Sequence, residues 1–109
     1  MLYNILYYRR TRGGSGGHTV KIRERFIFKG DVQGVGFRYR AYHAANALGL
    51  TGFVRNEYDG SVVMEAQGSR AGIDELINMI SNGLYIHIDD MTSRELPPDP
   101  DERAFTICG

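Results

Sequence analysis

Two stretches of helical periodicity, flanked by strand patterns, constrain the fold of this chain most strongly. In the first, apolar residues recur at intervals that place them on one helical face: Phe37, Ala41, Ala44, Ala45 and Leu48. The second stretch consists of Ile73, Leu76, Ile77 and Ile80. Gly49 and the Asn-Gly pair at 82–83 are typical helix ends. Because a chain of 109 residues has room for one core, both helices must bury their apolar faces against the same sheet.

Strand patterns occupy the segments before, between and after these helices. Alternating or continuous apolar residues predict strands at residues 20–28, 53–56, 62–66, 84–88 and 104–107. The pair Asp59-Gly60 predicts a hairpin turn between the second and third strands. Two βαβ crossovers interlocked in this order predict an α+β, ferredoxin-like split β-α-β fold. We expect an antiparallel sheet of four to five strands with the two helices on one face.

The first nineteen residues differ in composition from the rest of the chain. A short apolar and tyrosine-rich stretch is followed by Arg9, Arg10 and Arg12 and then by the glycine-serine run at 13–17. Such a run has a large backbone entropy and behaves as a flexible linker. We therefore divide the chain into a flexible N-terminal arm with a Gly/Ser linker, residues 1–19, and one folded domain, residues 20–109.

The formal net charge of zero hides a division between the two halves of the chain. Residues 1–55 hold ten Lys and Arg against two Asp and Glu, a net charge of +8, and residues 56–109 have a net charge of −8. This division favours an anionic ligand for the first half and argues against a basic nucleic-acid-binding domain. The single cysteine, Cys108, favours a reducing, cytoplasmic setting, and no apolar run is long enough to predict a membrane span.

Residues 30–38, GDVQGVGFR, join a predicted strand to the N-terminus of the first predicted helix. Glycines let successive N–H groups point into one concavity, and these donors, together with the helix dipole, bind a phosphate or carboxylate. Arg38 in the first turn can grip two phosphate oxygens at once. The same spacing is also compatible with an ordinary glycine-rich turn and a solvent-facing arginine. The loop lacks both the Lys-Ser/Thr of a Walker loop and the Rossmann glycine spacing.

Together with the segments LGLTGFVRN at 48–56 and DGSV at 59–62, this loop resembles the acylphosphatase family from about Val20 to Ile107. The resemblance implies that Arg38 binds phosphate and that Asn56 orients the attacking water. It also implies a phosphate cradle formed by the backbone amides of Gly30, Asp31, Val32, Gln33, Gly34, Val35, Gly36 and Phe37. Two departures from the family pattern are Phe53, where tryptophan is common, and the ending at 105–109, which lacks the usual basic and aromatic residues.

The family resemblance implies hydrolysis of acyl phosphates to a carboxylate and inorganic phosphate, which is also an expected inhibitor. A carboxylate leaving group needs no protonation, so a positioned water and a neutralised phosphoryl group suffice, with no metal or other cofactor. The histidines at 18, 43 and 87 lack metal-ligand spacing. Taken alone, Asn56 also fits a strand-end asparagine that satisfies turn backbone. We expect a monomer that binds neither nucleic acid nor membrane.

Two alternative functions remain open at this level. One is the acylphosphatase-like domain of a carbamoyl-phosphate-handling hydrogenase maturation factor. The other is an RRM-like RNA-binding module, because that module shares this order of elements and the arm contains Tyr7 and Tyr8 beside basic residues. Against RNA binding, residues 62–67 lack the stacking aromatic and basic side chains of an RRM strand.

Overall fold

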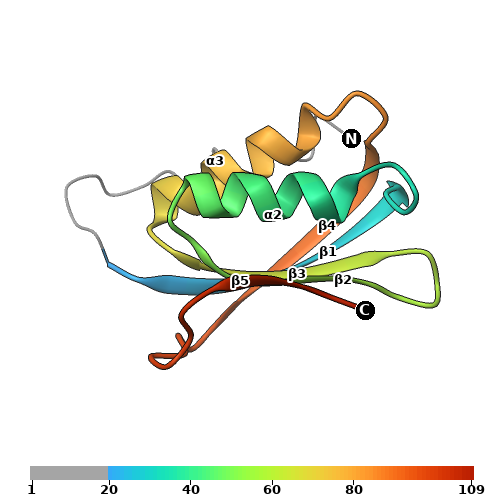
Figure 1. Cartoon of the computed structure of the whole chain (residues 1–109). Coiled ribbons are helices and arrows are strands. Elements are labelled where there is room, and N and C mark those ends of the chain that lie inside the picture. Colours follow the sequence, from blue (N-terminus) through green and yellow to red (C-terminus); the bar gives the residue numbers. More distant parts are fainter. Residues whose placement is uncertain (1–19) are drawn as a thin grey trace.

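The computed structural model describes residues 20–109, and residues 1–19, with the predicted arm, lie outside the described part. The elements are β1 (Ile22–Asp31), α2 (Phe37–Ala47), β2 (Thr51–Asn56), β3 (Val62–Gly68), α3 (Arg70–Ser81), β4 (His87–Leu96) and β5 (Phe105–Cys108). Figure 1 shows both helices lying on one face of a single sheet. Neither of these helices is long and apolar enough to cross a membrane.

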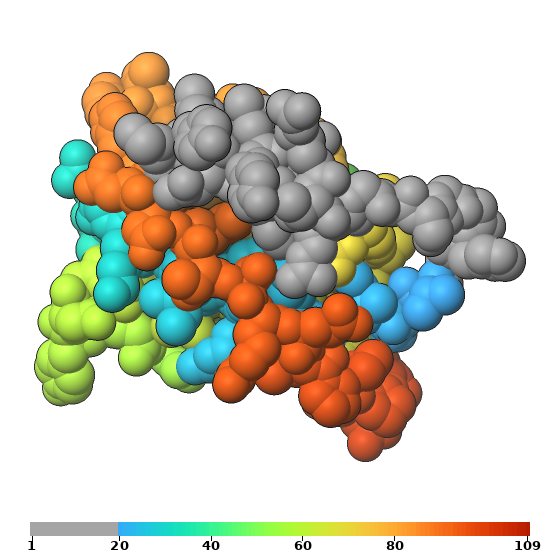
Figure 2. Space-filling model, turned by 180° about the vertical axis from the view of Figure 1, so that it is seen from behind, coloured from blue at the N-terminus to red at the C-terminus, as the bar shows by residue number. Residues whose placement is uncertain are grey.

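The sheet has the strand order β4-β1-β3-β2-β5. β1 pairs antiparallel with both β3 and β4, and β2 pairs antiparallel with β3. In Figure 2 the orange β4 at the edge of the sheet and the loop that follows it run across the face seen from behind. β5 pairs parallel with β2 and makes the sheet mixed. The ferredoxin-like α+β fold is confirmed. The predicted antiparallel pairing holds for β1 to β4 and is wrong for the fifth strand, which joins in the parallel sense.

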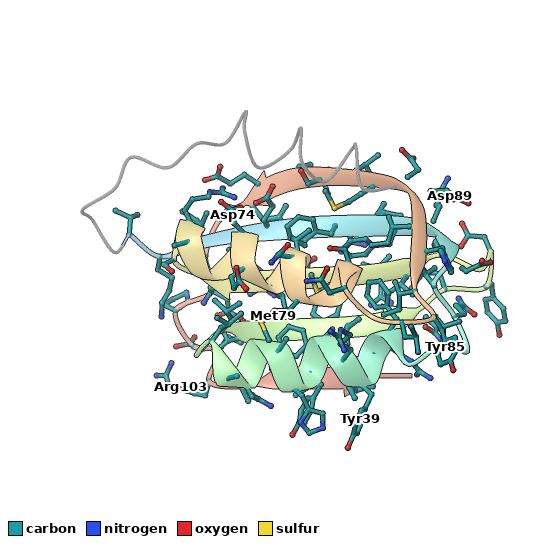
Figure 3. All side chains as sticks on the ribbon, turned by 90° about the horizontal axis from the view of Figure 1, so that it is seen from above. Tyr39, Asp74, Met79, Tyr85, Asp89 and Arg103 are labelled. Carbon is teal, nitrogen blue, oxygen red and sulfur yellow. The ribbon has the colours of Figure 1, made fainter. Side chains whose placement is uncertain are left out.

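The core lies between the sheet and the two helices. Phe26, Phe28 and Phe37 are almost fully buried, with ring centroids of Phe28 and Phe37 4.9 Å apart. Ser69 caps the N-terminus of α3, and its hydroxyl accepts a hydrogen bond from the Gly72 N–H at 3.0 Å. The predicted face of the second helix is confirmed, and that of the first is confirmed except for Leu48, which follows the helix as its C-cap and is half-buried. Seen from above in Figure 3, Met79 of α3 lies on the side of that helix that faces α2.

A polar network covers the opposite face of the two central strands. Arg23 donates from Nε to Glu65 at 2.8 Å and from Nη1 to Gln67 at 3.1 Å and to Glu102 at 2.8 Å. Gln67 also exchanges two hydrogen bonds with the backbone of Asp99. These bonds fasten the loop between β4 and β5 over the sheet, so that Glu65 and Gln67 are buried although they face away from the helices.

Two strand predictions are wrong in their boundaries. The sequence pattern predicts the fourth strand at residues 84–88, but Leu84 is 80% exposed and the strand runs instead from His87 to Leu96. A turn closed by the Ile86 N–H on the Gly83 carbonyl at 3.2 Å separates the end of α3 from this strand. β4 is an edge strand defined by backbone pairing with β1, which a polar sequence can satisfy. Val20, predicted in the first strand, precedes β1 and is exposed.

We predict that the stability contributed by Glu65 depends on pH. Burial would raise the pKa of Glu65, but hydrogen bonds from Arg23 and Arg25 outweigh burial and lower that pKa below its ordinary value. A lowered pKa stabilises the fold at neutral pH, and this contribution is lost as the pH falls through the folded-state value. Glu65→Gln should lower the free energy of unfolding by about 2 kcal/mol at pH 7, and the difference from the unaltered protein should shrink below about pH 4. Urea unfolding over this range measures both quantities.

Glu75→Gln on α3 is the matched control, and it should change the free energy of unfolding by less than about 0.5 kcal/mol at every pH. A deficit of Glu65→Gln that is the same at pH 7 and pH 3 would contradict the ionic origin of this stabilisation.

Candidate active site

The segment between β1 and α2 has a backbone conformation that two glycines make possible. Gly34 has φ 72° and Gly36 has φ 84°, both in the left-handed region that strains other residues. Gly36 is also the residue that precedes the first turn of α2. No side chain caps this end of the helix, and its first turn contains no acidic residue. The positive end of the helix dipole is therefore compensated neither by a side-chain cap nor by an acidic residue of its own first turn.

The backbone N–H groups from Gln33 to Tyr39 donate to no acceptor within residues 20–109. The first backbone hydrogen bond of the helix is made by the Arg40 N–H, which donates to the Gly36 carbonyl at 3.0 Å. Unsatisfied donors at a helix N-terminus, next to left-handed glycines, form an anion-binding concavity. We call residues 32–37, which carry most of these donors, the cradle loop.

Two side chains hold the cradle loop in place. Phe37 packs into the core against Phe28 and fixes the start of α2 to β1. From the other side of the loop, Gln33 donates its Nε2 to the carbonyl oxygens of Glu57 at 2.7 Å and Ser61 at 2.8 Å. The side chain of Gln33 is thus engaged with the β2–β3 turn, a role that sequence reasoning missed. These contacts connect the loop to the strand end that carries Asn56.

A hollow of about 290 Å³ opens beside the cradle loop. Its lining brings together both predicted catalytic residues and half of the predicted cradle: Val32, Gly34, Gly36, Phe37, Arg38, Tyr39, Asn56 and Ile107. Arg38 and Asn56 come from α2 and β2, which are adjacent because α2 packs over β2 and β5. The topology thus places a guanidinium and a carboxamide around the unsatisfied amides.

Asn56 is the last residue of β2 and has the same strand parity as the buried Val54, so it faces α2. Its Oδ1 is buried and accepts no hydrogen bond from any described residue. A buried acceptor without a partner costs free energy unless a ligand or water donates to it. The carboxamide is therefore suited to hold a water molecule at the hollow, and it does not have the turn-capping role that was the alternative.

Arg38 reaches over the last strand. Its Nη1 donates to the main-chain oxygen of Gly109 at 2.8 Å, and this is its one hydrogen bond to the described residues. The remaining guanidinium N–H groups are available to an anion in the hollow. Contact with Gly109 holds the long side chain at the rim and reduces the entropy that anion binding would otherwise cost.

The remaining predicted cradle residues lie elsewhere. Gly30 and Asp31 are paired in the sheet with Ile88 and His87 of β4, and they do not line the hollow. Val35 faces a second hollow on the other flank of α2. Phe53, which replaces the tryptophan common in the family, lies on the sheet face opposite Asn56, where the Arg55 guanidinium stands 5.3 Å from its ring centroid.

Comparison with known proteins decides the family. The sequence profile of the acylphosphatase family matches residues 24–107. An acylphosphatase of Oceanobacillus iheyensis is 42% identical over 81 residues, which cover 72% of this chain and 89% of that protein. One of Caldanaerobacter subterraneus subsp. tengcongensis is 47% identical over 79 residues, covering 72% and 88%. The chain belongs to the acylphosphatase family. In structure it is similar to the acylphosphatase of Bacillus subtilis, with a TM-score of 0.75 and 30% identity over 81% of this chain and 99% of that one.

The comparisons do not favour the two alternative functions. Full-length HypF, in a phosphate- and nucleotide-bound form, is 26% identical with a TM-score of 0.73, but the match covers 12% of that chain against 86% of this one. The acylphosphatases, in contrast, are matched over most of their own length. An RRM stacks bases on aromatic residues of the two central strands. Here the open face of β1 and β3 carries the Arg23 and Glu65 network, and Phe26 and Phe28 face the core instead.

We predict that Arg38→Ala weakens the binding of inorganic phosphate at least tenfold, because a charge-assisted hydrogen bond is worth about 1.5–3 kcal/mol. Isothermal titration of the protein with phosphate measures the dissociation constant. Arg94→Ala, which removes an exposed arginine of β4, is the matched control and should bind phosphate like the unaltered acylphosphatase. Equal dissociation constants for the two variants would show that Arg38 does not contact the anion.

Proposed function

We propose that this chain hydrolyses acyl phosphates to a carboxylate and inorganic phosphate by in-line attack of water on phosphorus. One observation supports this proposal above the others. The unsatisfied amides from Gln33 to Tyr39, the Arg38 guanidinium and the partnerless Oδ1 of Asn56 meet around one hollow. The first two groups are suited to an anion, and the third is suited to a water molecule beside it.

The cradle loop and Arg38 bind the phosphoryl group. Three phosphoryl oxygens carry the negative charge of the ground state and of the transition state, and backbone N–H groups in a fixed loop stabilise both without reorganising. The α2 dipole adds positive potential at the same place. Arg38, with a planar fork of donors, bridges two of these oxygens. Neutralisation of the phosphoryl group thus comes from the chain itself, and the scheme uses no metal ion or cofactor.

Asn56 positions the nucleophile. The Oδ1 accepts a hydrogen bond from the water, which directs an oxygen lone pair at phosphorus and leaves the second water hydrogen near a phosphoryl oxygen. As the new P–O bond forms, the bond between phosphorus and the bridging oxygen breaks. The carboxylate leaves with that electron pair and needs no proton. One proton of the water stays on the new P–OH group and the other passes to a phosphoryl oxygen, so that the products are a carboxylate and dihydrogen phosphate.

Three further properties belong to this proposal. Residues 20–109 form the catalytic domain, and residues 1–19 form an arm outside it. The acylphosphatase acts as a monomer that binds neither nucleic acid nor membrane, and the monomer agrees with a site in which Arg38, Asn56 and the cradle loop all come from one chain. The single cysteine supports a cytoplasmic location.

Asn56→Ala should lower kcat for acetyl phosphate by about a hundredfold or more, because an unoriented water is rarely aligned with phosphorus. The dissociation constant of inorganic phosphate should change little, since the phosphate ligands remain. Stopped assays of phosphate release together with titration calorimetry measure both quantities. Asn46→Ala, on the exposed side of α2, is the matched control and should keep the unaltered kcat. Wild-type turnover by Asn56→Ala would contradict the water-positioning role.

The unaltered protein should hydrolyse acetyl phosphate equally fast before and after dialysis against a chelator, because neutralisation is provided by amides and Arg38. Phosphate release is measured in metal-depleted buffer with and without added magnesium. Activity that disappears on chelation and returns with metal would overturn the mechanism.

A further inference from the structure

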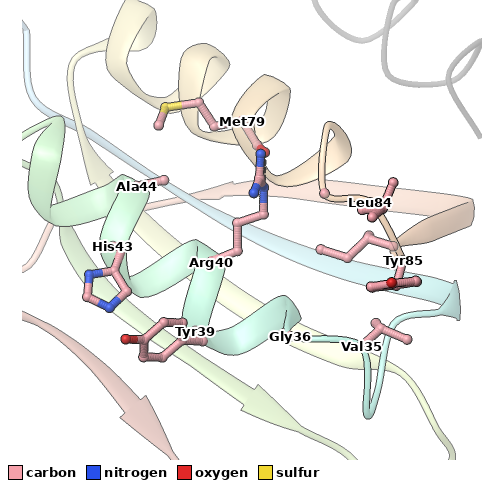
Figure 4. A pocket seen from close by; sticks show the side chains of 11 residues that line it. Val35, Gly36, Tyr39, Arg40, His43, Ala44, Met79, Leu84 and Tyr85 are labelled. Atoms are coloured by element: carbon pink, nitrogen blue, oxygen red, sulfur yellow. Dashed lines mark hydrogen bonds between the residues drawn. The ribbon is translucent and has the colours of Figure 1, made fainter.

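A second hollow, of about 500 Å³, lies on the other side of the α2 N-terminus, between α2 and the link from α3 to β4. Figure 4 shows the side chains that surround it, including Val35, Tyr39, Arg40, Met79, Leu84 and Tyr85. Arg40 extends across it and donates from Nε to the Met79 carbonyl at 2.6 Å, which joins the two helices. We call this hollow the helix groove.

The helix groove is continuous with the cradle. Gly36 and Tyr39 line both the helix groove and the hollow that contains Asn56. Arg38 and Arg40 are two residues apart and point to opposite flanks of α2, about 200° apart around the helix. Arg38 lines the hollow with Asn56 and Ile107, and Arg40 lines the helix groove. The cradle amides at the end of the helix lie between these two flanks.

If water displaces the carboxylate in line at phosphorus, the two flanks of α2 have different roles. The attacking water and the leaving oxygen stand on opposite sides of phosphorus. Since Asn56 places the water on the β2 flank, the carboxylate leaving group must point away from Asn56. The opposite flank is the helix groove, with Val35 of the cradle loop at its entrance.

Apolar and aromatic side chains form most of the lining of the helix groove, and Arg40 and His43 are its polar side chains. Leu84 is 80% exposed, Tyr85 68% and Tyr39 67%, and the deeper wall contains Met79 and the buried Ile86. A contiguous patch of exposed apolar side chains often marks a binding site, whereas single exposed apolar residues do not. A groove of apolar and aromatic walls with few polar groups binds an apolar ligand.

We propose that the helix groove binds the acyl group of the substrate, and that the preferred substrates are acyl phosphates with a ring-sized or branched apolar acyl group. This inference rests on the proposed function, because it assumes that a phosphoryl group occupies the cradle. Leu84 and Tyr85 form the outer wall against the acyl group, and Tyr39 forms the passage from the cradle. These residues determine specificity and take no part in bond breaking.

The test compares benzoyl phosphate with acetyl phosphate, which share the phosphoryl group and differ in the acyl group. In the variant Leu84→Ser/Tyr85→Ser, the ratio of kcat/KM for benzoyl phosphate to that for acetyl phosphate should fall about tenfold, the range expected for removal of apolar pocket contacts. The loss should appear in KM for benzoyl phosphate, since binding to the acyl group is the same in the ground state and the transition state. Both residues are exposed, so thermal unfolding should be little changed, and Leu84→Ala alone provides a milder second variant.

Tyr58→Ser is the matched control, because Tyr58 is a fully exposed tyrosine of the β2–β3 turn, away from the helix groove. Its substrate ratio should equal that of the unaltered protein. If both substrates are hydrolysed and the double variant keeps the original ratio, the inference is overturned and the proposed function stands. The inference is likewise overturned if the double variant changes only self-association in sedimentation velocity, which would make the groove a protein interface. If the unaltered protein hydrolyses neither substrate, the proposed function and the inference fail together.

Discussion

The central feature of the structure is a run of backbone N–H groups that the fold brings close together without giving them hydrogen-bond acceptors. From Gln33 to Tyr39 these donors find no acceptor within residues 20–109, and α2 starts without a side-chain cap or an acidic residue in its first turn. A loop without such constraints would change its backbone conformation so that these N–H groups found acceptors within the chain. Here Gly34 and Gly36 keep the backbone curled, and Phe37 and Gln33 fasten its two sides. An anion bound in this concavity would accept hydrogen bonds from these donors, as the proposed function requires.

The same hydrogen bonds connect the two parts of the proposed active site. Gln33 bonds to the carbonyl groups of the β2–β3 turn, so the loop that would hold phosphorus and the strand that ends at Asn56 form one unit. α2 then separates two flanks, with Arg38 and Asn56 on one side and the apolar helix groove on the other. In the proposed reaction, attack and departure on opposite sides of phosphorus match this division, and the helix groove is the surface that we propose for the acyl group. The polar network around Arg23 and Glu65 lies on the far face of the sheet and contributes stability rather than chemistry.

Local sequence patterns predict the elements that bury one regular face. They do not predict features that depend on strand pairing or on contacts between residues distant in sequence. The helical spacing from Phe37 and from Ile73, and the glycines of the cradle loop, are local signals, and the helices and the loop follow them. β4 extends well beyond the apolar pattern that predicts it, because its length is determined by backbone pairing with β1. The parallel pairing of β5 with β2 joins distant segments, and no local sequence pattern indicates it. The sequence places Gln33 in the phosphate loop, but the contact of its side chain with residues 57 and 61 cannot be inferred from its neighbours in sequence. Asn56 is assigned through family resemblance, since a strand-end asparagine alone does not distinguish a turn from a water site.

The most direct test of the central claim is to find which atom the water attacks. Acetyl phosphate is hydrolysed by the protein in water enriched in oxygen-18, and the products are analysed by phosphorus-31 NMR and mass spectrometry. Attack at phosphorus, which the cradle loop and Asn56 are arranged to direct, places one labelled oxygen in inorganic phosphate and none in acetate. Label in acetate, with unlabelled phosphate, would show that water attacks the carbonyl carbon. That result would contradict the assignment of the cradle and Asn56 to an in-line attack on phosphorus.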